Sequence, residues 1–166
     1  PNPGHKMLVE LEQHFKVTVI TQNIDDLHER AGSSRILHLH GELLKVRSTG
    51  NERMVMDWKK DVNLGDTCSM GYQLRPHIVW FGEEVPLLSE AAQITATADI
   101  LIIIGTSMQV YPAAGLLNYA KPEIPIYFID PKPSISASDF QNLTIIKSTA
   151  AKGVPTLVAD LIRTAL

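Results

Sequence analysis

Three largely apolar, β-branched runs most restrict the folds open to this sequence: Val17–Ile20, Ala98–Ile104 and Ile124–Ile129. Their apolar residues are consecutive rather than alternating, which indicates strands that are buried on both faces. Strands of this kind form parallel sheets with helices packed on each side, and helical patterns do separate the runs. The sequence therefore predicts an α/β fold built on a parallel sheet that helices cover on both faces.

The segments between these runs extend the alternation of strands and helices. A helical pattern follows the turn at residues 1–4, and proline at position 112 suits the first position of a helix. We predict helices at Leu27–Ala31, Leu87–Ala98, Pro112–Ala120 and Val154–Leu166, and further strands at Arg35–His40, Ile78–Phe81 and Leu143–Lys147.

A polar, turn-rich segment interrupts this alternation between about Leu44 and Gln73. It holds the only cysteine of the chain, Cys68. A chain of 166 residues suits one main domain. We therefore predict that residues 1–43 and 74–166 form that domain and that residues 44–73 form a small inserted module.

Charge, hydropathy and cysteine content argue against several classes of function. The net charge of −3 gives no bulk attraction to nucleic acid or to an anionic membrane. The longest apolar run, Ile100–Ile104, is too short to cross a bilayer, and no signal-peptide pattern opens the chain. One cysteine cannot form an internal disulfide. We expect a cytoplasmic protein with no nucleic-acid and no membrane partner.

Polar clusters follow the predicted strands, at the sheet edge where ligands bind in such folds. Gly105-Thr106-Ser107 comes directly after the most apolar strand. Its glycine permits close approach of a phosphate, and its hydroxyls and N–H groups can hydrogen-bond one; an ordinary strand–helix turn capped by Ser or Thr would look the same. The other clusters are Gln22–Asp25, His40-Gly41, Gly82-Glu83 and Asp130.

Two of these clusters contain side chains suited to catalysis or to nucleotide binding. The amides of Gln22 and Asn23 can read a carboxamide or ribose hydroxyls, although Asn23 or Asp25 could equally cap a helix. His40 ends a strand and could act as a general base near neutral pH. His38 shares its strand face, so a metal pair is conceivable, but no carboxylate or cysteine at suitable spacing supports one. We predict no metal site.

Five motifs occur together in one order: "TQNIDDLHERAG", "LHLHGE", "LRPHIVWFGE", "GTSMQVYPAA" and "STAAKGVP". In this order and at these separations they closely resemble the sirtuins, the NAD-dependent protein-lysine deacylases. "DWKKDV" and "RPHIVWFGE" are especially similar to the bacterial CobB-like branch. The resemblance covers nearly the whole chain, and it implies a Rossmann-like fold.

The resemblance also implies a role for particular residues. His40 would be the general base acting on a ribose hydroxyl. The acyl-lysine substrate would add as a strand, the acyl oxygen would attack the nicotinamide ribose, and nicotinamide, deacylated lysine and O-acyl-ADP-ribose would be released. Residues 130–132 stand where sirtuins typically place asparagine and glutamate. NAD would contact Gln22, Asn23, Ile24, Asp25, Gly105, Thr106, Ser107, Asp130, Pro131, Lys132 and Ala150, and the substrate would contact Val79, Trp80, Phe81, Gly82 and Val110.

The inserted module departs from the sirtuin pattern. In that family it usually holds a structural zinc through two pairs of cysteines. The corresponding positions here are Ser48, Asn51, Thr67 and Met70, and Cys68 lies near the second pair without a cysteine partner. A closed zinc site needs four good ligands. We therefore expect the module to fold without zinc, around apolar residues such as Met54, Val55, Met56, Trp58 and Leu64.

Three functions remain open at this point. The first is NAD-dependent deacylation of protein lysines, with acetyl or succinyl as possible acyl groups. The second is transfer of ADP-ribose to a protein by the same fold, and the third is a non-catalytic nucleotide-binding module. The 166 residues lack the glycine-rich Gly-Ala-Gly-Ile-Ser-like loop and the arginine that reach NAD in sirtuins. We thus expect a fragment of an enzyme, inactive by itself.

Overall fold

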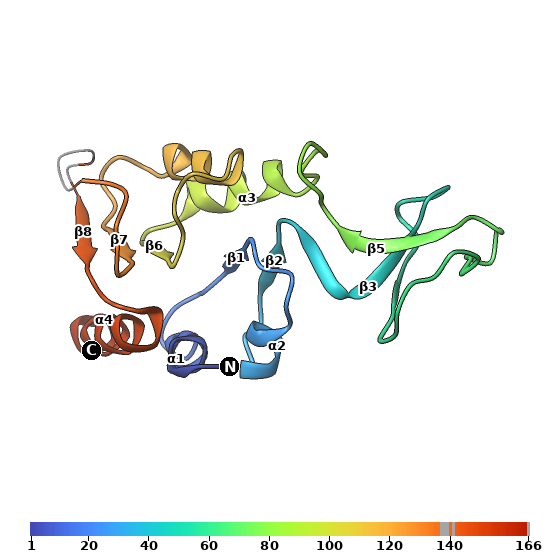
Figure 1. Ribbon diagram of the computed structural model, residues 1–166. Helices are drawn as coiled ribbons and strands as arrows, with labels where there is room; N and C mark the ends of the chain where they lie inside the picture. Colours follow the sequence, from blue (N-terminus) through green and yellow to red (C-terminus); the bar gives the residue numbers. More distant parts are fainter. Residues whose placement is uncertain (137–139, 141, 166) are drawn as a thin grey trace.

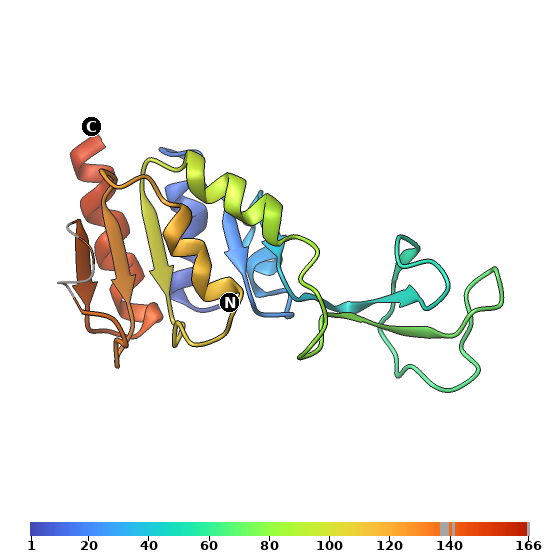
Figure 2. The same ribbon diagram turned by 90° about the horizontal axis from the view of Figure 1, so that it is seen from above.

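Two short parallel sheets form the centre of the protein. The computed structural model describes residues 1–136, 140 and 142–165. In one sheet β1 (Val19–Thr21) pairs with β2 (Ile36–His38). In the other, β7 (Ile126–Ile129) lies between β6 (Leu101–Ile104) and β8 (Leu143–Ile146). The two sheets stand side by side, with β1 next to β6 and the carboxyl ends of β1, β2, β6 and β7 on one side (Figure 2).

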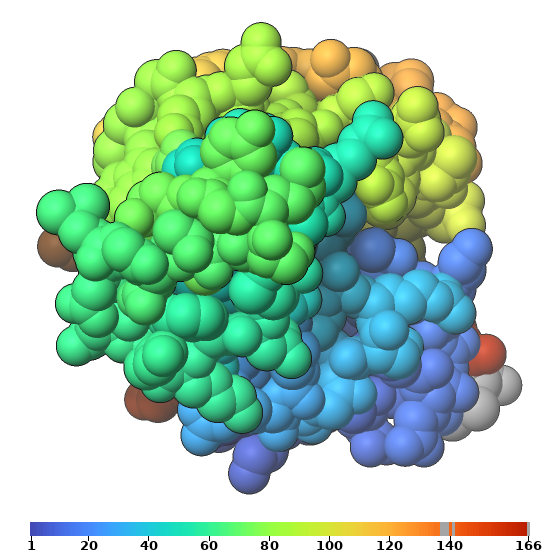
Figure 3. Space-filling view, turned by 90° about the vertical axis from the view of Figure 1, so that its right-hand side faces the viewer, coloured from blue at the N-terminus to red at the C-terminus, as the bar shows by residue number. Residues whose placement is uncertain are grey.

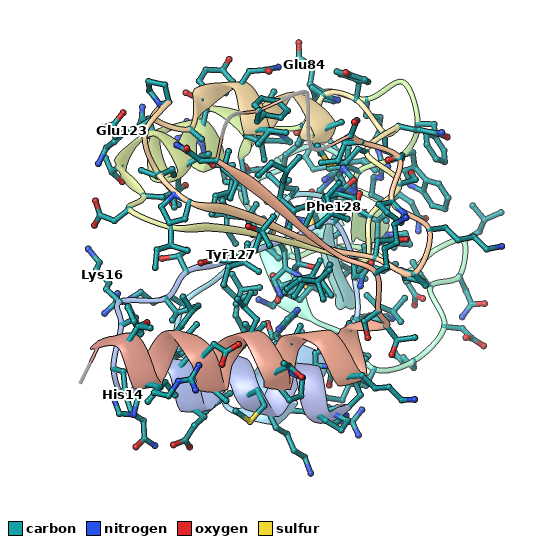
Figure 4. The ribbon with its side chains drawn as sticks, turned by 90° about the vertical axis from the view of Figure 1, so that its left-hand side faces the viewer. His14, Lys16, Glu84, Glu123, Tyr127 and Phe128 are labelled. Carbon is teal, nitrogen blue, oxygen red and sulfur yellow. The ribbon has the colours of Figure 1, made fainter. Side chains whose placement is uncertain are left out.

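Helices cover both faces of these strands, as Figure 1 shows. On one face lie α1 (Pro3–Leu11) and α4 (Ala150–Ala165), and on the other lie α3 (Leu88–Thr97) and the 3₁₀ helix η1 (Ala113–Tyr119). The short helix α2 (Leu27–Ala31) connects β1 to β2. Adjacent residues of β7 point to opposite faces: Tyr127 packs toward α1 and α4, and Phe128 packs toward the other layer (Figure 4). This arrangement confirms the predicted α/β class.

Close packing of α4 on the sheet anchors this side of the core. Phe128 and Ile129 are fully buried. Gly153 of α4 lies directly over Ile129, where a Cβ atom on Gly153 would stand 2.6 Å from the Ile129 Cγ2 atom. Only glycine permits this approach, so the residue serves packing rather than flexibility. Among the described residues, no helix is both long and apolar enough to cross a membrane.

Residues of the predicted insert, together with the residues that flank it on both sides, form a separate antiparallel sheet. Strand β3 (Gly41–Ser48) lies between β4 (Val55–Asp57) and β5 (Leu74–Ile78). Val46, Cys68 and Leu74 make its small core. The module projects from one end of the molecule, and Figure 3 shows it in front of the main domain. The main domain of residues 1–43 and 74–166 and the insert of residues 44–73 remain a proposed division.

Several predicted elements are corrected by the structure. The strand predicted at Ile78–Phe81 is β5, which ends at Ile78 and pairs antiparallel with β3 outside the parallel sheets. The predicted helix at Pro112–Ala120 is the 3₁₀ helix η1. The last helix begins at Ala150 rather than Val154, so that Pro155 lies inside the helix near its start. Strand β3 was not predicted, because its residues read as part of a loop.

Candidate active site

His40 lies just beyond β2, with its imidazole turned toward the loop that follows β1. Its Nδ1 atom is 3.1 Å from the Gln22 carbonyl oxygen. A carbonyl oxygen only accepts hydrogen bonds, so in the neutral ring Nδ1 carries the hydrogen and Nε2 is left with a free lone pair. The backbone therefore holds His40 in the tautomer that a general base needs.

His38 makes different contacts, although it shares a strand face with His40. The His38 Nε2 atom is 2.6 Å from Glu29 Oε1, and its Nδ1 atom is 3.3 Å from the Asn23 carbonyl oxygen. The His38 side chain is only 8% exposed. Burial is the largest single influence on the pKa of Glu29 and raises it, but the hydrogen bond to His38, a backbone hydrogen bond and the proximity of His38 and His28 together leave that pKa below its ordinary value. These contacts give His38 a structural role in joining α2 to β2.

Carboxylates do approach His38 in space, which its sequence spacing did not indicate. Potential ligand atoms of Glu29, His38 and Glu42 lie within 4.8 Å of one another. Glu42 also forms an ion pair of 2.9 Å with Lys45. The sequence did not indicate this cluster, because Glu29 comes from α2 and Glu42 from β3. In the chain these elements precede and follow the strand that carries His38.

The Gln22–Asp25 cluster forms a tight turn at the carboxyl end of β1. Thr21 Oγ1 accepts a hydrogen bond from the Asn23 N–H at 3.1 Å, and Asp25 Oδ1 accepts one from the Leu27 N–H at 3.0 Å. Neither Asn23 nor Asp25 is the N-cap of α2, which is Asp26, although the Asp25 carboxylate does bond the first helical residue, Leu27. The Ile24 carbonyl accepts from the Leu43 N–H at 2.7 Å, which ties this turn to β3.

The Gly105–Ser107 cluster forms a turn at the carboxyl end of β6. Gly105 has φ +60°, a conformation that favours glycine, and among the described residues, its two chain neighbours aside, no atom lies within 4 Å of the point where a Cβ would stand. Thr106 Oγ1 accepts from the Met108 N–H at 3.2 Å, and the Ser107 carbonyl accepts from the Ser134 hydroxyl at 2.7 Å. The turn thus leaves open space beside a bare backbone, as close contact with a phosphate or ribose requires.

The remaining predicted nucleotide contacts lie at the ends of β7 and β8. Asp130 directly follows β7, and its Oδ1 atom accepts a hydrogen bond from the Lys132 N–H at 2.6 Å. Pro131 lies between these two residues, and Ala150 is the first residue of α4. The predicted nucleotide contacts therefore lie after parallel strands, in loops or, for Ala150, at the start of α4.

The predicted substrate segment, residues 79–82, follows β5 and is joined to His40 by a backbone hydrogen bond. The Val79 N–H donates to the His40 carbonyl at 2.9 Å. Trp80 is 55% exposed and Phe81 is 98% exposed, so large apolar surfaces face solvent here. Val110, after the Gly105 turn, is 38% exposed. Exposed apolar loops beside a fixed histidine suit the binding of an extended peptide.

Fold and site together define a Rossmann-like α/β protein with polar turns and an oriented histidine at the carboxyl ends of its parallel strands. The Sir2 family profile matches residues 1–112. An NAD-dependent protein deacylase of Helicobacter pylori strain J99 is 56% identical over 165 residues, which cover 99% of this chain and 70% of that protein. One of Bacteroides thetaiotaomicron is 49% identical over 168 residues, covering 98% of this chain and 71% of that protein.

Solved structures give the same result. The structure described as a Sir2 homolog–NAD complex superposes with a TM-score of 0.86 at 34% identity, covering all of this chain and 66% of the other. Sir2Af2 bound to a myristoylated histone peptide superposes with a TM-score of 0.79 at 34% identity, covering 99% of this chain and 73% of the other. The chain belongs to the Sir2 family, and it spans about 70% of the length of the Helicobacter relative.

Proposed function

We propose that this protein is an NAD-dependent protein-lysine deacylase. Family membership and the names of the relatives support the reaction class. Within the chain, the observation that carries the proposal is the 3.1 Å contact from His40 Nδ1 to the Gln22 carbonyl, since it directs a basic Nε2 atom away from the backbone. Acyl-lysine, NAD and one water molecule would be consumed, and the products would be nicotinamide, the free lysine and an O-acyl-ADP-ribose.

The residues at the strand ends fit a dinucleotide. Gly105, Thr106 and Ser107 would receive the ribose or phosphate in the open space beside the Gly105 backbone. Bound NAD supplies the ribose carbon that the acyl oxygen attacks and the nicotinamide leaving group. His40 Nε2 takes the proton from a ribose hydroxyl, and the Gln22 carbonyl stabilises the imidazolium through Nδ1–H. Further contacts are assigned to Gln22, Asn23, Ile24, Asp25, Asp130, Pro131, Lys132 and Ala150.

Acyl-lysine side chains of proteins or peptides are the proposed substrates. Related structures are described as complexes with a myristoylated histone peptide and with a p53 peptide and NAD⁺. In this chain the half-buried Val79, the exposed residues 80–82 and the exposed Val110 would pair with the peptide backbone and contact the acyl chain. We place the enzyme in the cytoplasm. We propose no nucleic-acid or membrane partner, in line with the net charge of −3.

The inserted module does not fit the structural zinc that its family usually holds. The Ser48 hydroxyl, at one expected ligand position, donates to Cys68 Sγ at 3.3 Å and accepts from the N–H groups of Gly50 at 3.2 Å and Asn51 at 3.3 Å. These hydrogen bonds occupy Ser48, and the other expected positions hold Asn51, Thr67 and Met70, which are poor zinc ligands. We propose that this polar network and the apolar core of the module replace the metal.

A product assay on the full-length protein tests the proposed function. The protein is incubated with NAD and an acetyl-lysine peptide or a succinyl-lysine peptide, and the products are measured by mass spectrometry. We expect free lysine peptide, nicotinamide and O-acyl-ADP-ribose in equal amounts. Transfer of ADP-ribose to protein without loss of the acyl group would instead identify an ADP-ribosyltransferase. NAD binding without any product would identify a nucleotide-binding module.

A further inference from the structure

Glu83 lies at the junction between the inserted module and the proposed substrate segment. Its Oε2 atom accepts a hydrogen bond from the Trp80 N–H at 3.0 Å, and its own N–H donates to the Trp80 carbonyl at 3.0 Å. These two bonds close a turn over residues 80–83. The turn carries the exposed side chains of Trp80 and Phe81.

The same carboxylate is bound by two arginines of the antiparallel sheet, one in the inserted module and one in the strand that follows it. Arg75 Nη1 donates to Glu83 Oε1 at 2.7 Å, and Arg47 Nη2 is 3.5 Å from Glu83 Oε2. Arg47 of β3 and Arg75 of β5 are direct cross-strand partners. Two like charges in that position repel each other unless an anion lies between them. Glu83 supplies that anion.

Burial makes this arrangement sensitive to the charge of Glu83. The Arg47 side chain is only 9% exposed, and among the described residues its Nε atom has no hydrogen-bond partner. A guanidinium this buried needs a counter-charge. Hydrogen bonds from Arg75 and from the Trp80 N–H hold the pKa of Glu83 below its ordinary value of 4.5, so Glu83 is anionic at neutral pH.

The substrate segment is therefore held at both ends. At one end the Val79 N–H bonds to the carbonyl of His40, the proposed base. At the other end Glu83 forms ion pairs with Arg47 of β3 and Arg75 of β5. We propose that Glu83 is a positioning residue, through which the module holds residues 79–82 in the conformation that binds the acyl-lysine peptide. This inference rests on the proposed deacylase function.

Kinetics of Glu83→Gln in the full-length protein test the inference. Glutamine keeps the size of the side chain but removes the charge that the arginines need. We expect the KM for the acyl peptide to rise about tenfold, while kcat and the KM for NAD change less than about threefold. Glu84→Gln is the matched control, since Glu84 is the neighbouring carboxylate, is exposed and points away from the molecule (Figure 4). The control should behave like the unmodified protein.

A second measurement reports on the segment without turnover. Trp80 becomes the only tryptophan in a Trp58→Phe background. In this background Glu83→Gln should make Trp80 fluorescence more accessible to acrylamide, and Glu84→Gln should not. Arg75→Gln should have the same effect as Glu83→Gln with Arg47 untouched, so it serves if Glu83→Gln does not fold.

The outcomes separate this inference from the proposed function. A peptide KM in Glu83→Gln that equals that of Glu84→Gln would overturn the positioning role. Absence of deacylation by the unmodified protein would refute the proposed function instead. In that case quenching decides: equal quenching of Trp80 in Glu83→Gln and in the unmodified protein overturns the inference, and greater quenching in Glu83→Gln supports it.

Discussion

At the scale of single residues, two histidines two positions apart have separate tasks. Sequence periodicity places His38 and His40 on one strand face and does not distinguish them. The structure does, because His38 bonds to Glu29 and to the Asn23 carbonyl, whereas His40 uses Nδ1 alone, on the Gln22 carbonyl. The difference depends on elements far away in the sequence, so His40 could be proposed as a base but its tautomer could not.

We predict that His40→Ala in the full-length protein lowers kcat for deacylation at least about 100-fold, because the base is lost. The melting temperature should stay close to that of the unmodified protein. His14→Ala is the control, because His14 is an exposed histidine in the segment after α1 and belongs to none of the candidate site clusters, and its kcat should not change. Near-normal turnover by His40→Ala, measured with an acetyl-lysine peptide, would remove His40 from this role.

At the scale of elements, the inserted module is part of a small antiparallel sheet for which we propose that no metal is needed. Its core is small, so isolated strands of this length would be marginal in water. The Ser48–Cys68 hydrogen bond and the pairing of β3 with both neighbours supply the remaining order. The loss of the cysteines was visible in the sequence. The hydrogen-bond network that takes their place was not, because it joins residues 20 positions apart.

We predict that purified protein contains well under one zinc ion per chain by elemental analysis, because only poor ligands occupy the expected positions. Addition of EDTA should shift the melting temperature by less than about 1 °C, since no bound metal stabilises the fold. As a positive control, a different protein with a structural zinc ion is treated with EDTA in parallel, and its melting temperature should fall. Stoichiometric zinc in the purified protein, released by EDTA together with the loss of the fold, would contradict the prediction.

At the scale of the whole molecule, several histidines make folding depend on pH in one direction. His5 of α1 and His28 of α2 have ring centroids 4.7 Å apart, and the His28 Nδ1 atom is buried with no hydrogen-bond partner among the described residues. Burial is the main cause that holds the pKa values of His5 and His28 below 6.5, and proximity to His5 lowers that of His28 further. Burial likewise lowers the pKa of His77.

We predict that the free energy of unfolding falls as pH decreases below about 6.5. In that range the unfolded chain takes up protons on these histidines while the folded protein does not, so acid favours unfolding. Urea unfolding at pH 7.5 and pH 5.5 measures the difference, and His28→Gln should reduce it. Equal or greater stability at pH 5.5 would show that these side chains gain protons in the folded state as readily as in the unfolded state.

The sequence by itself determined the α/β class, the order of most strands and helices, and the candidate site at the strand ends. These features depend on local composition, because buried parallel strands need consecutive apolar residues and the turns after them need glycine and polar side chains. The five motifs also carried the family resemblance. The predicted strand at Ile78–Phe81 shows the limit, because its apolar run could not reveal that β5 ends at Ile78 and pairs with β3.

Tertiary structure alone decided which groups face one another. It turned His40 Nδ1 onto the Gln22 carbonyl, brought Glu29 to His38, and set Glu83 between Arg47 and Arg75. Each contact joins separate elements, and its strength depends on burial and on the exact approach of two atoms. Neither quantity is encoded in local residue patterns, because both arise only when β3, β5 and the parallel strands pack into one folded chain.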